Sequence, residues 1–152
     1  MFSNKGDETG YGSELDGAYA FSDALSLKAN YTYHDTTEQT TNAIGAAPKH
    51  LLYAEANWEF LPRTFFDLNV RGVFDRARAT PDPRPPVDDY ITVNVSLRKE
   101  DIHGVDLAFT LRNIFDEDAR DPSSDNGLSS IVPLADTPLP GREFWGEIQV
   151  RL

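Results

Sequence analysis

Apolar and polar residues alternate along most of this chain with a period of two. In the clearest stretch, 25–34, the odd-numbered positions hold Leu, Ala and Tyr, whereas the even-numbered positions hold Ser, Lys, Asn, Thr and His. Successive side chains of an extended strand point to opposite faces, so this spacing predicts a strand with one apolar and one polar face. The same alternation predicts seven strands, at 11–22, 25–34, 52–60, 65–75, 91–98, 105–112 and 143–152. Segments with helical periodicity are nearly absent, so we predict an all-β chain.

The predicted strands are long, and the connections between them differ in length in a regular way. Strands of about ten residues exceed the usual length in soluble sheets, and they suffice for a tilted strand to cross a bilayer. Short connections are expected at Ser22–Asp23, Leu61–Arg63 and Lys99–Gly104, and long ones at Asp35–Lys49, Ala79–Val87 and Glu117–Gly141. Bacterial barrels combine short periplasmic turns with long extracellular loops. We therefore predict an antiparallel up-and-down meander that forms an open segment of a transmembrane β-barrel.

Two-faced strands also occur in soluble β-sandwiches, where the polar face meets bulk water. Three features favour the membrane barrel: the strand lengths, the loop lengths, and the Tyr and Phe residues near strand ends on the apolar face, as an interfacial girdle requires. Without the loop pattern, these aromatic residues would be interpreted as ordinary core filling. A soluble β-sandwich that serves as a binding or adhesion module is the alternative.

Composition narrows the class of protein and is compatible with a barrel. The mean hydropathy is −0.47, and no apolar run reaches the roughly 18 residues of a transmembrane helix. Barrel strands are apolar on one face only and barrel loops are polar, so a low mean hydropathy does not exclude a barrel. The net charge of −11 leaves no basic footprint for nucleic acid. The chain has no cysteine, which excludes disulfides and thiolate metal sites.

Sequence signatures of enzymes are missing, and we predict that the chain is not an enzyme. It has no nucleophile elbow, phosphate-binding loop or dinucleotide-binding glycine motif. Glu55 and Glu59 are about 13 Å apart along one strand, which is too far for a glycosidase pair. Metal-ligand spacing is lacking among the three histidines, His34, His50 and His103. We interpret one acidic cluster as a solvated loop and predict no metal or cofactor there: Asp116, Glu117, Asp118, Asp121 and Asp125.

Five short motifs lie between or within the predicted strands. They are Gly12-Ser13-Glu14-Leu15-Asp16-Gly17, Leu25–Tyr33, Ala47-Pro48-Lys49-His50-Leu51, Asn113-Ile114-Phe115-Asp116, and Pro140-Gly141-Arg142-Glu143-Phe144. Each resembles, in the same order, a motif from the C-terminal barrel of TonB-dependent receptors. With the strands between the motifs, the resemblance covers essentially the whole chain. The residues that carry the resemblance most directly are Gly12, Glu14, Leu15, Pro48, His50, Asn113, Phe115, Asp116, Pro140, Gly141, Arg142 and Phe144.

Physical roles can be expected for several of these motif residues. Asn113 and Asp116 end the alternation, and both residue types favour turns through hydrogen bonds from side chain to backbone. Pro140 fixes φ at the end of a loop, and Gly141 is expected to adopt a conformation closed to other residues. Arg142 is a candidate partner for a loop carboxylate, Asp116 or Asp118. All of these roles support the fold, and none implies chemistry.

The resemblance implies a receptor in the outer membrane that takes up a scarce, bulky ligand, such as a ferric siderophore, with energy delivered through TonB. Its expected partners are outer-membrane lipid, a plug domain and TonB, with ligand contacts from the three long loops. Seven strands are too few to close a bacterial barrel, and plugged transporters have about 22. We therefore expect residues 1–152 to be the C-terminal part of a barrel whose plug domain and earlier strands lie elsewhere. A porin-type barrel that works without TonB is a further alternative.

Overall fold

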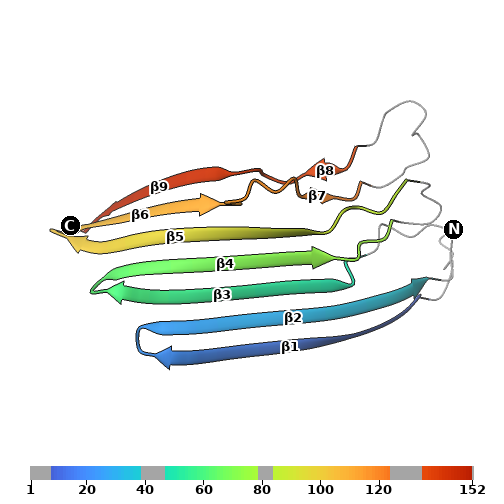
Figure 1. Cartoon of the computed structure of the whole chain (residues 1–152), viewed down its shortest axis with the longest axis horizontal. Helices are drawn as coiled ribbons and strands as arrows, with labels where there is room; N and C mark the ends of the chain where they lie inside the picture. Colours follow the sequence, from blue (N-terminus) through green and yellow to red (C-terminus); the bar gives the residue numbers. More distant parts are fainter. Residues whose placement is uncertain (1–7, 39–46, 79–83, 124–134, 152) are drawn as a thin grey trace, which may run out of the picture.

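The computed structural model describes residues 8–38, 47–78, 84–123 and 135–151. These residues form nine strands (Figure 1), and no helix among them is long and apolar enough to cross a membrane. Seven strands build the main sheet: β1 (Glu8–Ser22), β2 (Leu25–Glu38), β3 (His50–Leu61), β4 (Thr64–Phe74), β5 (Tyr90–Ile102), β6 (Val105–Arg112) and β9 (Glu143–Val150). Two strands of two residues each form a separate pair, β7 (Arg120–Asp121) and β8 (Thr137–Pro138).

The main sheet is an antiparallel meander, as the alternation predicts. Its strand order is β1-β2-β3-β4-β5-β6-β9, so each strand pairs with its neighbours along the sheet, and β1 and β9 are the two edges. Tight turns join β1 to β2, β3 to β4 and β5 to β6 at one end of the sheet, which we call the turn end (Figure 1). The described parts of the longer connections lie at the opposite end, the loop end. The predicted fold class is therefore confirmed.

Strand boundaries differ from the prediction at two connections. β2 continues to Glu38, so part of the predicted Asp35–Lys49 loop is strand, and the predicted Lys99–Gly104 turn is shortened because β5 continues to Ile102. The backbone accommodates this tight turn through left-handed conformations at Asp101, His103 and Gly104, with φ of 55°, 54° and 84°. The amide of Asp101 also donates to the Asp106 carboxylate at 2.7 Å.

The register of the sheet places the apolar positions of all seven strands on one face. Leu27 pairs with Ala56, and this row continues through Leu68, Val95, Leu111 and Phe144. We call this side the apolar face and the opposite side the polar face. Large side chains on the apolar face are open, with exposed fractions of 71% for Leu15 and 73% for Ile148. Within the described ranges, no second sheet or helix layer covers this face, which contradicts the sandwich alternative.

A small buried core lies at the loop end of the polar face. Val73 and Tyr90 are register partners there, and Ala119 packs against them with Leu139. The predicted irregular loop Glu117–Gly141 thus contains the β7–β8 pair, which lies against the polar face instead of extending freely into solvent. The prediction failed here because β7 and β8 are too short to show alternation. This packing brings two loops together over one end of the sheet.

Candidate functional site

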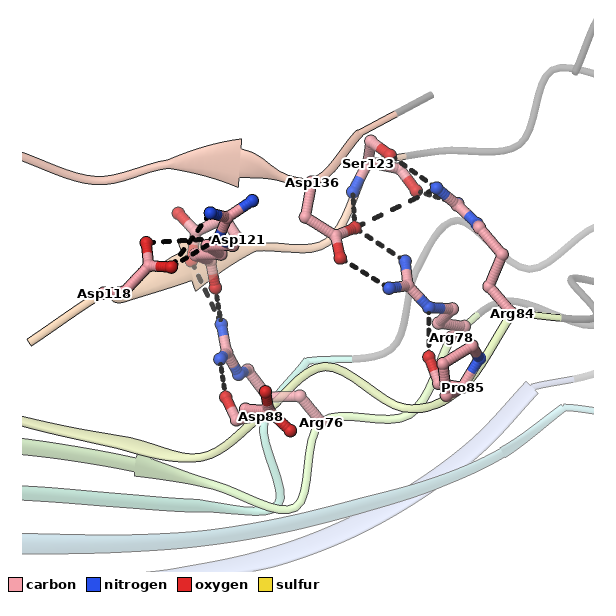
Figure 2. Close-up of polar contacts among 10 residues, drawn as sticks. Arg76, Arg78, Arg84, Pro85, Asp88, Asp118, Asp121, Ser123 and Asp136 are labelled. Atoms are coloured by element: carbon pink, nitrogen blue, oxygen red, sulfur yellow. Dashed lines mark hydrogen bonds and ion pairs between the residues drawn. The ribbon is translucent and has the colours of Figure 1, made fainter. Parts of the chain in front are cut away.

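The loop between β4 and β5 meets the loop between β6 and β9 in a cluster of arginines and carboxylates (Figure 2). We call this group the loop-end cluster, and its members are Arg76, Arg78, Arg84, Asp121, Ser123 and Asp136. It is the most extensive charged network in the described part of the long connections, so it is the candidate functional site.

Arg76 is the buried anchor of the loop-end cluster, with only 3% of the residue exposed. Its guanidinium donates to the backbone carbonyls of Arg120 and Asp88 and lies 3.4 Å from an Asp121 oxygen (Figure 2). It also lies 4.8 Å from the centroid of the Tyr90 ring, a cation–π distance. A buried guanidinium is costly unless it is hydrogen-bonded and paired. These contacts therefore hold β7 in place against the β4–β5 loop.

Arg78 and Arg84 hold the β4–β5 loop against two residues of the β6–β9 loop. These residues are Ser123, which precedes residues 124–134, and Asp136, which follows them. The two terminal nitrogens of Arg78 donate to the two Asp136 oxygens at 2.7 and 2.5 Å, a bidentate pair. Arg84 donates to the hydroxyl and the carbonyl of Ser123 at 2.9 and 2.8 Å. The amide of Ser123 donates to Asp136 at 3.2 Å, so both sides of the clamp share one carboxylate (Figure 2).

The electrostatics of this clamp favour the ionised form of Asp136. Hydrogen bonds from Arg78 lower the pKa of the Asp136 carboxyl from 3.8 to about 2, although partial burial opposes the shift. Nearby, the Asp118 carboxylate raises the pKa of the Arg120 guanidinium through hydrogen bonds. Asp118 therefore pairs with Arg120, at 2.9 Å, and not with Arg142. These ion pairs therefore hold the two loops in position.

Asn113 forms the corner at which β6 ends and the long loop begins. It is 4% exposed and has a left-handed backbone with φ of 47°. Its side-chain amide donates to the carbonyls of Glu117 and Pro140 at 2.9 and 3.3 Å, and its side-chain oxygen accepts from the Glu117 amide at 2.9 Å. One side chain thus fixes both stems of the β6–β9 loop, through the kind of side chain to backbone hydrogen bonds expected of Asn113.

Asp116 and Gly141 complete this corner. Their contacts differ in part from those expected for Arg142 and Gly141. Asp116 also has a left-handed backbone, with φ of 58°, and its carboxylate accepts from the backbone amide of Arg142 at 2.9 Å. The expected Arg142 contact with Asp116 is therefore made by its backbone. Gly141 is not among the described residues with positive φ. A Cβ at this position would lie 3.2 Å from Asp116, so close approach explains the glycine.

The polar face below the cluster carries amides that hydrogen-bond carboxylates and one another. Asn30 donates to Glu14 at 2.9 Å and to Asp16 at 2.6 Å, both from β1. Asn94 donates to Asn69 at 3.2 Å and accepts from the Asn113 amide at 2.9 Å. These amides and carboxylates make the middle of the polar face hydrophilic. It is the kind of wall that lines the polar interior of a barrel.

Aromatic side chains gather at both ends of the apolar face. At the loop end, the Tyr33 ring lies 6.1 Å from Tyr11 and 5.2 Å from His50. At the turn end, Tyr19 contacts Phe21 and Trp58 contacts Phe60, with centroids 4.7 and 5.5 Å apart. Tyr11 and Tyr19 are eight positions apart, about 26 Å along a strand. The spacing, reduced by strand tilt, suits the aromatic girdles that flank the apolar band of barrels.

The remaining motif residues take up structural positions in the sheet. A Cβ at Gly12 would meet the Tyr33 carbonyl oxygen at 2.6 Å, which explains the glycine on β1. His50 begins β3 and shares a hydrogen bond of 2.7 Å with the Tyr31 hydroxyl. Pro48 precedes β3, and three apolar motif residues are strongly exposed: Leu15, Phe115 and Phe144. The motif residues therefore lie at the loop end or near the middle of the strands, spread across the sheet from β1 to β9, and do not form one site.

Sequence reasoning missed the arginines of the loop-end cluster and the lone tryptophan of the polar face, Trp145. Arg76, Arg78 and Arg84 lie around a proline-rich segment, opposite an acidic loop, and that complementarity was a usable signal. Three carboxylates of the acidic cluster have partners: Asp116 accepts from the Arg142 amide, Asp118 pairs with Arg120, and Asp121 lies beside Arg76. Asp125 lies outside the described residues. No group suited to hold a metal ion is found within the described ranges.

The fold and its two faces define a class of protein: an open, antiparallel segment of a membrane β-barrel, with polar and apolar walls. Residues 1–114 match the family model for the TonB dependent receptor-like β-barrel, and the chain belongs to this family. The family comprises receptors and transporters and is not an enzyme family. The match includes Gly12, His50 and Asn113, whereas β9 and the loop before it lie beyond it. No curated protein matches this chain.

Proposed function

We propose that this chain forms part of the barrel wall of an outer-membrane receptor for TonB-driven uptake of a scarce, bulky ligand, such as a ferric siderophore. One observation carries the proposal: the register collects the apolar side chains of seven strands on one uncovered face and the hydrogen-bonding side chains on the other. A wall with these two faces separates lipid from a wet interior. Membership of the receptor family supports uptake as the process that such a wall serves.

In this proposal, residues 1–152 are the C-terminal part of the barrel, and its other strands and a plug domain complete the receptor. The edges β1 and β9 pair with those strands, because unpaired backbone groups are too costly inside a bilayer. The polar face looks toward the plug, and the turn end toward the periplasm and TonB. The proposed partners are therefore lipid, the remaining barrel, the plug and TonB.

The loops at the loop end make the proposed ligand contacts. The loop-end cluster ties the β4–β5 and β6–β9 loops together before any ligand arrives, through Arg78, Arg84 and Asp136. Loops held in one arrangement lose less conformational entropy when a ligand binds. The cluster is thus proposed to position these two loops, while the neighbouring exposed side chains meet the ligand.

The two tryptophans of the chain allow a direct test of the wall, because they lie on opposite faces. Trp58 pairs with Leu25 and Phe66 on the apolar face, whereas Trp145 pairs with Thr110 on the polar face. The signal of Trp58 is the part of the fluorescence that disappears in Trp58→Phe, and we expect brominated lipid to quench it. The signal of Trp145 disappears in Trp145→Phe, and we expect aqueous iodide to quench it. Equal quenching of both signals by brominated lipid would refute the proposed orientation.

Uptake distinguishes the receptor from a porin-type barrel. The family match favours the receptor. Cells that produce the receptor are expected to accumulate radiolabelled ferric siderophores only while TonB is present and the inner membrane is energised. Accumulation that continues after TonB is deleted would favour a passive pore.

A further inference from the structure

Trp145 is an exception in its register row on the polar face of the sheet. Its register row runs through Ser26, Asn57, Asp67, Ser96 and Thr110, all of which are small or medium-sized polar residues. Trp145 nevertheless leaves 53% of its surface exposed. An indole presents a large apolar surface, and keeping it exposed on a wet wall is unfavourable without a binding partner. The position therefore marks a surface for recognition.

Two charged side chains are arranged around the Trp145 ring. The guanidinium of Arg112, on β6, lies 5.1 Å from the centroid of the ring. The indole nitrogen donates to Glu143 at 3.2 Å, and Glu143 lies 3.6 Å from Arg112. Arg112 and Glu143 are register partners, so the pairing of β6 with β9 fixes this group. We call Trp145, Arg112 and Glu143 the aromatic triad.

The aromatic triad stays accessible, and its neighbours leave room beside it. The side chains of Arg112 and Glu143 are 55% and 35% exposed. Thr110 lies opposite Trp145, and Ala108 follows on the same face of β6. β9 begins at Glu143, at the loop end, so the triad lies on the side from which an external ligand arrives.

From this geometry, and on the basis of the proposed receptor function, we propose that the aromatic triad binds a neutral ring bearing several hydroxyl groups, such as a pyranose sugar. The apolar C–H face of such a ring stacks on the indole. Each hydroxyl group both donates and accepts hydrogen bonds, and it finds an acceptor in Glu143 and donors in Arg112. Because these two charges pair with each other, the triad carries no net charge to favour an ionic ligand.

Three cations of the nearby loops are already paired with carboxylates. In the described loops, Lys49 lies 3.5 Å from Asp35, Arg78 pairs with Asp136, and Arg120 pairs with Asp118. An anionic ligand would have to displace a carboxylate from one of these cations. A hydroxylated ring needs no such exchange, because Arg112 and Glu143 form charge-assisted hydrogen bonds with neutral groups.

The test uses the receptor as the cell produces it, purified in detergent and applied to an array of immobilised oligosaccharides. We expect at least one class of oligosaccharide to bind, with affinity reduced about tenfold or more in Trp145→Ala and partly retained in Trp145→Phe. Glu143→Gln keeps the side-chain shape and is expected to weaken binding without loss of folding. The matched control is Trp58→Phe, which alters the other face and is expected to bind normally.

Two results would overturn the inference: binding of no oligosaccharide on the array, or equal binding by the parent receptor and Trp145→Ala. Protection of Trp145 from iodide in the ligand-free receptor would overturn it as well, because another part of the receptor would then cover the triad. None of these results touches the receptor proposal, which fails separately if uptake does not depend on TonB. Resistance of the folded barrel to unfolding in SDS without heating checks that each variant has folded.

Discussion

Arg78 and Asp136 lie 58 positions apart in the chain and form a bidentate ion pair, with nitrogen–oxygen distances of 2.7 and 2.5 Å. Arg78 follows β4, whereas Asp136 lies just before β8. The pair therefore connects two loops that the sheet itself keeps separate. The side chains of both residues are mostly buried, at 7% and 17% exposed, so solvent screens the pair less than a surface ion pair.

Removing this pair is expected to loosen the two loops and leave the wall intact. Arg78→Ala deprives Asp136 of its bidentate partner, and we expect local opening to become easier by about 1–3 kcal/mol. Hydrogen exchange of amides near Ser123 and Leu139 is the measurement. The charge-swapped double variant, Arg78→Asp with Asp136→Arg, is expected to recover part of the loss. Unchanged exchange in Arg78→Ala would contradict the proposed clamp.

The clamp is expected to weaken in strong acid because of Asp136. Its pKa lies at about 2 in the folded chain, below the 3.8 of the free group. A depressed pKa means that the ionised carboxylate stabilises the fold above pH 4, and that this contribution is lost as the pH falls toward 2. Pepsin digestion of the loops between pH 4 and pH 2 measures the loss. Asp136→Asn is expected to show a weaker dependence on pH, and an identical dependence would argue against this assignment.

Asn113→Ala is expected to disrupt the corner at the end of β6. The change removes the acceptor of the Glu117 amide and the donor to two carbonyls, at a buried position. We expect a loss of about 2–3 kcal/mol in unfolding free energy, measured by urea titration in detergent micelles. Phe115→Ala is the control, because Phe115 is 69% exposed and only two residues away. Similar losses in both variants would contradict a special role for Asn113.

Gly12 and Gly17 offer a matched pair on β1. A Cβ at Gly12 would lie 2.6 Å from the backbone oxygen of Tyr33, whereas a Cβ at Gly17 would meet nothing within 4 Å. Gly12→Ala is therefore expected to push β1 away from β2 and cost about 1–3 kcal/mol. Gly17→Ala is expected to be neutral or mildly stabilising. The same urea titration compares the unfolding free energies of the two variants. Equal values would show that the close contact at Gly12 can relax without loss of stability.

The sequence predicts the wall well and the loops poorly, for a physical reason. Alternation specifies a strand only when it continues over several residues, as in the stretch 25–34. The two residues of β7 are too few to show alternation. Alternation also cannot predict that Arg76 binds a carbonyl and a carboxylate from a loop about 45 positions away. Asn113 could be predicted as a turn residue because its side chain acts locally. The ends of β2 and β5 depend on partners across the sheet, which alternation does not encode.

The fixing of both loop stems by Asn113 has an evolutionary consequence. Glu117 and Pro140 are held by the same amide, so the stretch between them starts and finishes at one point of the wall. Substitutions, insertions and deletions inside that stretch leave the attachment point in place. In the proposed receptor, the exposed parts of this stretch can therefore change while the wall and the buried contacts of Ala119 and Leu139 are kept.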